Sequence, residues 1–352
     1  MKKRFIIYFI LICLTAESLT LSSCGKKTEK FTEYSFDYFD TASTIIGYAE
    51  SEEEFDSVCG DIFSQLENYH RLFTIYHRYE NFENLCTINE LKDGEHRTVE
   101  VDRAIIDLLL YCKDVYNMTG GKVNIAMGSV LSIWHDYRSE GMDEPWNAKL
   151  PPMEKLESAA EHTDINNLII DEENCTVKIT DPEMKLDVGA IAKGYAVEMV
   201  ARDLEEKGIT GYVLNIGGNV RTIGVKGDGN KWKVGVENPD REDEENPYVA
   251  HASLSGESLV TSGSYQRYYT VDGKNYHHII DRDTLMPAEY FASVSIITKS
   301  SADGDMLSTA LFCMDLENGL ELIESLPDTE AMWIDLQGNK HFSSGFEKYT
   351  EE

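Results

Sequence analysis

The 352-residue sequence predicts an α+β fold, in which largely antiparallel, mixed sheets pack with helices. Segments rich in β-branched and aromatic residues dominate from about residue 165 onward, which is typical of strands. Most of these segments follow one another directly, and this favours antiparallel pairing. Helical patterns interrupt them at about 190–207, 304–314 and 316–325. The sequence shows no internal repeat and no clean linker, so we expect one domain over residues 34–352.

The first segment of the chain differs from the rest. Basic residues at 2–4 precede an apolar run over about 5–16, and the tetrapeptide Leu-Ser-Ser-Cys follows at 21–24. The run is short for a membrane span, and a small residue before cysteine is typical of a bacterial lipoprotein signal. We expect residues 1–23 to be a signal peptide and Cys24 to carry the lipid, which anchors the protein to the extracytoplasmic side of the cell membrane. The alternative is an ordinary signal peptide with a chance cysteine.

The charge and the cysteines exclude several classes of protein. The formal net charge is −31, and removal of residues 1–23 would leave −33, because that segment carries three basic residues and one acidic residue. Such a charge disfavours nucleic acid and anionic lipid surfaces as partners, so we expect membrane contact through the lipid anchor only. Five cysteines remain, at positions 59, 86, 112, 175 and 313. Their scattered spacing fits neither a disulfide framework nor a zinc site and predicts small apolar core residues.

The elements follow in chain order from hydrophobic periodicity. Residues 24–33 are predicted to be a polar, lipidated tether, 38–50 a strand, and 52–73 a helix with one apolar stripe. A second helix is predicted over 101–121, with an aspartate near its start and two glycines at its end. Residues 139–152 have the composition of a loop. Strands are predicted at 166–171, 175–180, 211–218, 220–227, 231–239 and 258–263, within 266–281, and at 291–298.

The predicted helix that begins near Asp303 carries two polar side chains on one face. Asp305 and Thr309 are four residues apart, and this spacing places both oxygens on one side of a helix. A carboxylate and a hydroxyl in this arrangement could hold one hard cation such as Mg²⁺. The alternative is an aspartate favoured by the helix dipole and a threonine that bonds back to a carbonyl. The segment alone leaves both interpretations open.

Residues 185–208 form a second informative segment. A predicted strand ends at Asp187, a glycine turn follows, and Lys193 lies in the first turns of a helix. This layout can present backbone N–H groups and a cation to a phosphate, although an exposed lysine beside a glycine turn would give the same pattern. Adjacent histidines occur further on, at His277 and His278. Neighbouring side chains of a strand face opposite ways, so at most one of the two can face a site.

Ordered motifs show that the chain resembles the ApbE family of bacterial flavin transferases over nearly all of the mature region. The motifs are FDTASTI (39–45), LFTIYH (72–77), TIN (87–89), NIAMGSVLSIWH (124–135), LDVGAIAKGYAVE (186–198), NIGGN (215–219), TSGSYQRYY (261–269), HIIDRDT (278–284) and DGDMLSTALF (303–312). The resemblance implies a Mg²⁺-dependent reaction in which FAD, as substrate, is cleaved at its pyrophosphate. FMN then goes to a threonine hydroxyl of a target protein, and AMP leaves.

The resemblance also implies roles for individual residues. It implies that Asp187 and Lys193 contact FAD, and that Asp305 and Thr309 bind the metal together with the main-chain oxygen of Ala190. The position of His278 matches the family histidine proposed to take the proton from the acceptor threonine. The remaining positions that match ligand contacts are Phe39, Tyr76, Ala126, Met127, Gly128 and Ile279.

Four positions depart from the pattern of the family. Asn124 and Ser129 stand where many relatives have Asp and Pro, and Arg282 and Leu285 replace the usual Pro and Gly of the turn after His278. We expect the altered turn to affect the geometry of the base and the preference for a target.

Two other functions would use the same donor site. One is a metal-dependent FAD pyrophosphatase that gives FMN and AMP, and the other is a non-catalytic, FAD-binding lipoprotein. The targets expected for a transferase are proteins with an FMN-acceptor threonine, such as redox-pump subunits or FMN-binding domains. The sequence does not name the target.

Overall fold

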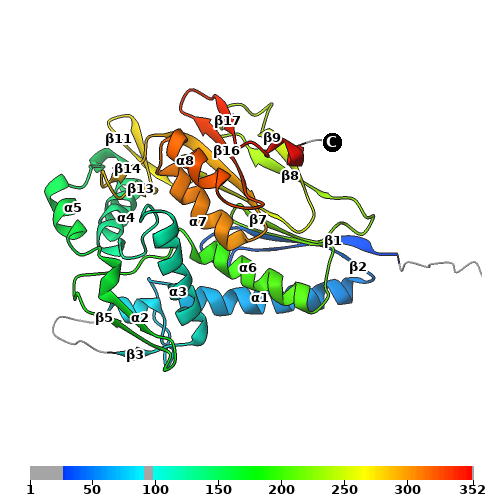
Figure 1. Ribbon diagram of the computed structural model, residues 1–352, viewed down its shortest axis with the longest axis horizontal. Helices are drawn as coiled ribbons and strands as arrows, with labels where there is room; N and C mark the ends of the chain where they lie inside the picture. Colours follow the sequence, from blue (N-terminus) through cyan, green and yellow to red (C-terminus); the bar gives the residue numbers. More distant parts are fainter. Residues whose placement is uncertain (1–26, 91–97, 351–352) are drawn as a thin grey trace, which may run out of the picture.

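The computed structural model describes residues 27–90 and 98–350 and is built around one eight-stranded sheet (Figure 1). The strand order is β1-β2-β6-β7-β10-β15-β16-β17, and every neighbouring pair is antiparallel. The α+β prediction is therefore confirmed. These strands are β1 (Glu29–Ser35), β2 (Ser43–Ala49), β6 (Tyr212–Ile216), β7 (Asn219–Ile223), β10 (Ser258–Gly263), β15 (Phe291–Thr298), β16 (Glu330–Asp335) and β17 (Lys340–Phe342).

Helices cover one face of this sheet and form the main hydrophobic core with it. They are α1 (Glu52–Phe73), α6 (Ala192–Glu206), α7 (Ser301–Phe312) and α8 (Leu316–Glu324) (Figure 1). α1 shows why the sequence forms a helix here. The Ser51 hydroxyl caps its first turn, and buried Phe55, Ile62 and Leu66 lie on one side. The other face of the sheet packs against the hairpin of β8 (Trp232–Glu237) and β9 (Tyr248–Leu254) and against α9 (Glu347–Thr350).

A second group of elements packs beside the sheet (Figure 1). It contains α2 (Leu85–Asn89), α3 (Arg103–Met118), α4 (Gly128–Asp143), η1 (Pro145–Asn147), α5 (Met153–Ala160) and η2 (Ile165–Asn167). A small sheet combines β3 (Val99–Glu100), β5 (Thr176–Ile179) and β4 (Leu168–Asp171). Two hairpins complete the group, β11 (Tyr268–Val271) with β12 (Lys274–His277), and β13 (Ile280–Asp281) with β14 (Met286–Pro287).

Several predicted boundaries are wrong. Residues 29–33 of the predicted tether belong to β1, a largely exposed edge strand whose polar sequence hides its pairing with β2. Residues 139–143 of the predicted loop continue α4, because the helix that begins at Gly128 was not predicted. The strands β9, β16 and β17 were also missed, since short runs with few alternating apolar residues carry little periodicity. The predicted helices α1, α3, α6, α7 and α8 are all present within two or three residues of their expected ends.

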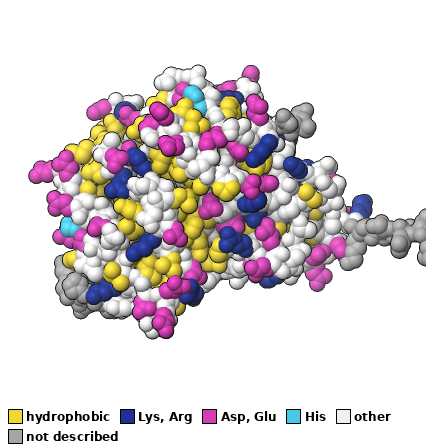
Figure 2. Space-filling view, in the orientation of Figure 1, with side chains coloured by type: hydrophobic (Ala, Val, Ile, Leu, Met, Phe, Trp, Pro, Cys, Tyr) yellow, Lys and Arg dark blue, Asp and Glu magenta, His cyan; other side chains and the backbone are white. Residues whose placement is uncertain are grey.

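The predicted signal peptide and Cys24 lie outside the described residues. Among the residues that the structure describes, no helix is both long enough and apolar enough to cross a membrane. The five remaining cysteines are free, and four of them are buried, as predicted for apolar core residues, whereas Cys175 is partly exposed. Figure 2 shows acidic side chains scattered over the visible face with basic ones between them, so the strong negative charge is not gathered there in one patch.

Candidate active site

A pocket of about 220 Å³ lies where the central sheet meets the second group of elements. α6 and α7 supply one wall, α4 supplies another, and the segment after β12 supplies a third. An adjoining pocket of about 140 Å³ shares Tyr76, Asp187, Lys193 and Arg267 with it. Most of the sequence-predicted site residues line the larger pocket, namely Tyr76, Met127, Asp187, Ala190, Lys193, His278, Ile279, Asp305 and Thr309.

The crossing of α6 and α7 fixes the position of Asp305. Its Oδ2 atom accepts a hydrogen bond of 2.7 Å from the backbone N–H of Gly194. α6 has no side-chain cap of its own, because Ile191 stands at that position, so Asp305 satisfies one of the free N–H groups of the first turn. The other carboxylate oxygen, Oδ1, lies 3.7 Å from Nζ of Lys193. The contact therefore brings a carboxylate and an ammonium to the same pocket wall.

Lys193 is held from the opposite side by the NIGGN bend. Its Nζ atom donates to Oδ1 of Asn219, which is fully buried, and lies 3.5 Å from the carbonyl oxygen of Gly217. Burial lowers the pKa of Lys193, and the Asp305 carboxylate opposes that effect. Gly217 and Gly218 adopt positive φ angles of 57° and 90°, which other residues rarely do. The two glycines thus allow the tight bend that brings Asn219 and the Gly217 carbonyl to the lysine.

Asp187 joins the lysine helix to the segment before α4. Its Oδ1 atom accepts from the backbone N–H of Gly189 at 2.8 Å, and its own N–H donates to the carbonyl of Ile125. Burial raises the pKa of Asp187. The segment at Ala126 to Gly128 is less open than the resemblance implies. Only Met127 lines the pocket, because the N–H of Ala126 bonds to Oδ1 of Asn124 and that of Gly128 bonds to the Lys185 carbonyl.

The two adjacent histidines face different surroundings, as expected, although β12 ends at His277 and His278 lies just after it. His277 is buried, with Nε2 at 2.9 Å from the Ala288 carbonyl and its ring edge against Phe312. His278 lines the pocket, and its Nδ1 lies 3.2 Å from the carbonyl of Arg267. Burial lowers the pKa of His278 to about 3, with Arg138 and Arg267 adding to the effect. His278 is therefore neutral at physiological pH, and because Nδ1 donates to the Arg267 carbonyl, Nε2 carries the free lone pair.

Four ionisable pocket residues were not singled out from the sequence: Lys122, His135, Arg138 and Arg267. Nη2 of Arg138 lies 3.2 Å from Nδ1 of His135, and the His135 ring lies 5.1 Å from that of Tyr76 at an angle of 32°. The i, i+3 spacing of His135 and Arg138 would have been informative only if residues 128–143 had been predicted as a helix. Phe39, by contrast, lines only the adjoining pocket, beside His70, which accepts a hydrogen bond from its N–H.

The turn after His278, which lacks the usual Pro and Gly, is held by contacts with other elements. Leu285 adopts a φ of 57°, which costs a residue with a β-carbon about 1–2 kcal/mol. The Leu285 carbonyl accepts from the indole N–H of Trp134 at 2.9 Å, and Nη1 of Arg282 donates to the Gly121 carbonyl at 3.0 Å. Lys122 adds ion pairs to Asp281 and Asp283, at 3.2 and 2.8 Å. These contacts hold the turn that follows His278, and the expected effect on the base and on the target stays a prediction.

The other two departures from the family pattern, Asn124 and Ser129, both have hydrogen-bond partners. Asn124 donates from Nδ2 to the Thr163 carbonyl at 2.9 Å, while its Oδ1 holds the N–H of Ala126. The Ser129 hydroxyl donates to the Ala159 carbonyl at 2.9 Å. Both side chains therefore fix the start of α4.

The oxygen atoms near Asp305 suit a hard cation that is bound partly by the protein and partly by the phosphates of a substrate. Within residues 27–90 and 98–350, no group of three or more His, Cys, Asp or Glu side chains could hold a metal ion. The residues present are the Asp305 carboxylate, the Thr309 hydroxyl and Ala190, which line one pocket. Mg²⁺ usually takes one or two protein carboxylates and completes its coordination with water and substrate phosphates. This oxygen set fits Mg²⁺ in that mode, and does not fit a metal held by protein alone.

Known proteins resemble this chain in sequence. The model of the ApbE family matches residues 39–333. A FAD:protein FMN transferase from Klebsiella pneumoniae is 29% identical over 277 residues, which cover 75% of this chain and 81% of that protein. The FAD:protein FMN transferase of Treponema pallidum is 31% identical over 250 residues, covering 67% of each chain. The FAD:protein FMN transferase of Haemophilus influenzae is 25% identical over 355 residues, which cover 97% of this chain and 97% of that protein.

Solved structures resemble the chain over most of its length. The ApbE protein from Thermotoga maritima superposes with a TM-score of 0.79 at 26% identity, and the match covers 92% of this chain and 100% of that one. The flavin transferase ApbE from Vibrio cholerae superposes with a TM-score of 0.75 at 23% identity. The match covers 92% of this chain and 99% of that one, which shows the shared fold. With the family match over residues 39–333, these findings establish that the chain belongs to the ApbE family.

Proposed function

We propose that this chain transfers FMN from FAD to a threonine hydroxyl of a target protein and releases AMP. The observation that carries the proposal is the convergence of Lys193, Asp305 and neutral His278 on one pocket. A cation, a candidate metal ligand and a base are the groups that phosphoryl transfer to a hydroxyl requires. The names of the relatives, FAD:protein FMN transferase, support the same reaction.

The charge and shape of the site support FAD as the donor. Lys122, Arg138, Lys193 and Arg267 line the larger pocket of a chain whose net charge is −31. These cations favour an anionic ligand such as a diphosphate. The two adjoining pockets share residues, which suits an elongated ligand with the diphosphate near the shared residues. Tyr76 is 54% exposed, and its ring could stack on an aromatic part of that ligand.

In the proposed reaction the threonine oxygen attacks the phosphorus of the FMN half. The bond between that phosphorus and the bridging oxygen breaks, and AMP leaves with the bridging oxygen. His278 takes the proton of the threonine hydroxyl, which is a weak nucleophile without a base. Lys193 and Arg267 neutralise charge on the diphosphate oxygens. Mg²⁺ held by Asp305, Thr309 and the Ala190 carbonyl would supply further charge neutralisation.

We also propose that Cys24 is acylated and anchors residues 34–352 to the extracytoplasmic face of the membrane. The basic start, the short apolar run and the Leu-Ser-Ser-Cys sequence at 21–24 support this. β1 begins at Glu29, five residues after Cys24, so the tether would hold the domain close to the membrane.

The test is incubation of the soluble chain from residue 25 with FAD, Mg²⁺ and an FMN-binding domain. Flavin fluorescence of the denatured acceptor band reports covalent transfer, and chromatography reports free FMN and AMP. A transferase gives a fluorescent acceptor with one AMP per flavin attached. Free FMN and AMP with an unmodified acceptor would identify a pyrophosphatase, and bound FAD without AMP would identify a binding protein.

A further inference from the structure

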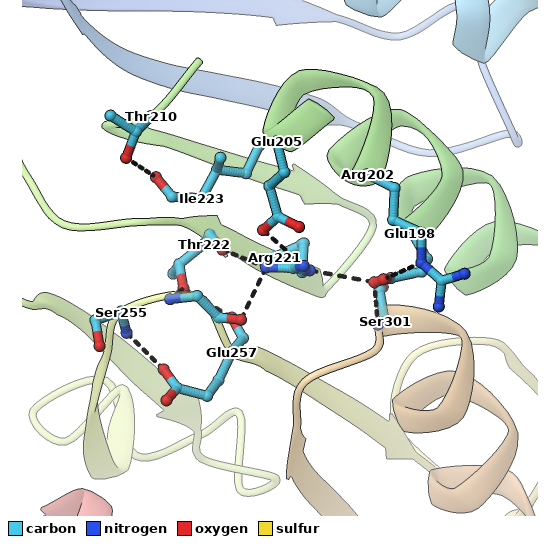
Figure 3. A network of polar contacts seen from close by, with 11 residues as sticks. Glu198, Arg202, Glu205, Thr210, Arg221, Thr222, Ile223, Ser255, Glu257 and Ser301 are labelled. Carbon is cyan, nitrogen blue, oxygen red and sulfur yellow. Dashed lines mark hydrogen bonds and ion pairs between the residues drawn. The ribbon is translucent and has the colours of Figure 1, made fainter. Parts of the chain in front are cut away.

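A buried polar network lies behind the pocket, where α6, α7 and β7 meet (Figure 3). Its centre is the ion pair of Glu198 in α6 and Arg221 in β7, with exposed fractions of 3% and 4%. Nε of Arg221 lies 3.1 Å from Oε2 of Glu198, and Nη2 lies 2.9 Å from Oε1 of Glu205. Neither Glu198 nor Arg221 lines the pocket described above. The network therefore has no direct contact with a ligand there.

Glu198 also holds the start of α7. Its Oε2 accepts from the backbone N–H of Ser301, the first residue of α7, at 2.9 Å (Figure 3). In the opposite direction, Asp305 of α7 accepts from the N–H of Gly194 in α6. Each helix thus supplies a carboxylate to the free N–H groups of the other. The two contacts are four residues apart on both helices, so together they fix the register of the crossing.

The same strand supports both sides of this crossing. Asn219 and Arg221 are two residues apart on β7 and so point to the same face. Asn219 holds Nζ of Lys193, and Arg221 holds Glu198. A shift of Glu198 would move the N-terminus of α7, and Asp305 lies one turn further along that helix.

A buried ion pair is a weak source of stability, because removal of both charges from water offsets most of their attraction. The place of this ion pair at the helix crossing points to a role in positioning rather than in stability. Resting on the function proposed above, we propose that Glu198, braced by Arg221, is a positioning residue that sets Asp305 relative to Lys193. It acts through the Ser301 N–H and touches no reacting atom.

The test compares Glu198→Met and Glu198→Gln with a matched control, Glu205→Gln. Glu205 lies on the same helix and also pairs with Arg221, but no contact joins its side chain to α7 among the described residues. Glu198→Gln keeps one oxygen that can accept from Ser301, and Glu198→Met keeps none. Thermal melting of each variant without ligand shows which of them fold.

The first readout is amide hydrogen exchange at Gly194, without FAD or metal. Gly194 is the third residue of α6, so its N–H has no partner within the helix, and its exchange reports the contact with Asp305. Exchange there should accelerate about tenfold or more in Glu198→Met and remain as in wild type in Glu205→Gln. Because this readout needs no turnover, it tests the positioning role even if the wild-type chain released no AMP.

The second readout is AMP release from FAD. A displaced Asp305 should lower kcat about tenfold to a hundredfold in Glu198→Met, less in Glu198→Gln, and leave the affinity for FAD within about threefold. Wild-type exchange at Gly194 together with wild-type kcat in a folded Glu198→Met would overturn the proposal. If Glu198→Met does not fold, Glu198→Gln decides, because its neutral amide weakens the pair with Arg221 that braces residue 198. Unchanged exchange and kcat in that variant would overturn the proposal equally.

Discussion

Asp305 of α7 accepts a 2.7 Å hydrogen bond from the backbone N–H of Gly194 in α6. The contact requires that the two helices approach closely. A β-carbon on Gly194 would lie 2.4 Å from Cβ of Asp305 and 2.4 Å from the Ser301 carbonyl oxygen. The glycine that follows Lys193 is therefore part of the site, since it lets a carboxylate from one helix reach the start of the other.

Gly194→Ala should push the two helices apart. We expect a loss of about 1–3 kcal/mol in the free energy of unfolding, because extra volume enters a packed crossing. FAD turnover should fall more than this loss alone explains, since Asp305 moves. The control is Gly60→Ala in α1, where a β-carbon meets nothing within 4 Å and should stabilise the helix by about 0.4–1 kcal/mol. Chemical denaturation measures both, and a wild-type stability for Gly194→Ala would contradict the packing described.

Asp305→Asn should remove most metal-dependent FAD turnover and keep the fold. The amide oxygen can still accept from Gly194, but it lacks the charge that favours a hard cation. The measurement is AMP release over a series of Mg²⁺ concentrations. Asp303→Asn is the matched control, because Asp303 lies on the same helix and bonds to the Tyr111 hydroxyl, away from the pocket lining. Turnover by Asp305→Asn equal to that of wild type at every Mg²⁺ concentration would remove Asp305 from the reaction.

His278→Ala should nearly abolish covalent flavinylation while FAD still binds. A threonine hydroxyl needs a base, whereas slow hydrolysis by water can persist. His277→Ala should retain transfer at low temperature and melt earlier than wild type, because His277 is buried against Phe312. The mass of the acceptor distinguishes the two variants. Full FMN addition by His278→Ala would show that another group takes the proton.

The pH dependence of stability follows from the lowered pKa of His278, which is about 3 in the folded chain. An unfolded histidine titrates near 6.5, so below that pH the unfolded state binds a proton that the folded state does not. Stability should therefore fall as the pH drops from about 6.5 towards 3, and this contribution should be constant above 6.5. Between pH 7 and pH 5, the melting temperature of His278→Gln should fall by less than that of wild type. An identical loss in both would mean that His278 is not held in its neutral form.

Cys24→Ser should leave the protein unprocessed or released from the membrane, because no thiol remains to carry the lipid. Fractionation of cells and metabolic labelling with a fatty acid measure the outcome. Normal acylation of the variant would exclude Cys24 as the attachment site.

The local parts of this structure could be predicted from the sequence. The i, i+4 spacing of Asp305 and Thr309 is a property of one helix, and both residues line the pocket as that spacing suggested. The different surroundings of His277 and His278 agree with the alternation expected of neighbouring residues, although β12 ends at His277 and His278 lies just after it. The contact of Asp305 with Gly194 could not be predicted, since it joins residues 111 positions apart.

Other features were hidden by weak local signals. Arg138 was missed because the helix that positions it, α4, begins without a side-chain cap and has few regularly spaced apolar residues. Nothing in the local sequence indicates that Leu285 adopts a positive φ, where its N–H bonds to the Asp281 carbonyl and its carbonyl accepts from Trp134. Tertiary contacts override local preference in both cases.

The most direct test of the central claim is the intact mass of an FMN-binding domain after incubation with the soluble chain, FAD and Mg²⁺. The same domain with its acceptor threonine changed to valine is the control. The account predicts a gain of one FMN group on the first domain, none on the second, and one AMP released for each group attached. An unchanged mass of the first domain while FAD is consumed, or equal labelling of both domains, would contradict transfer to a threonine hydroxyl.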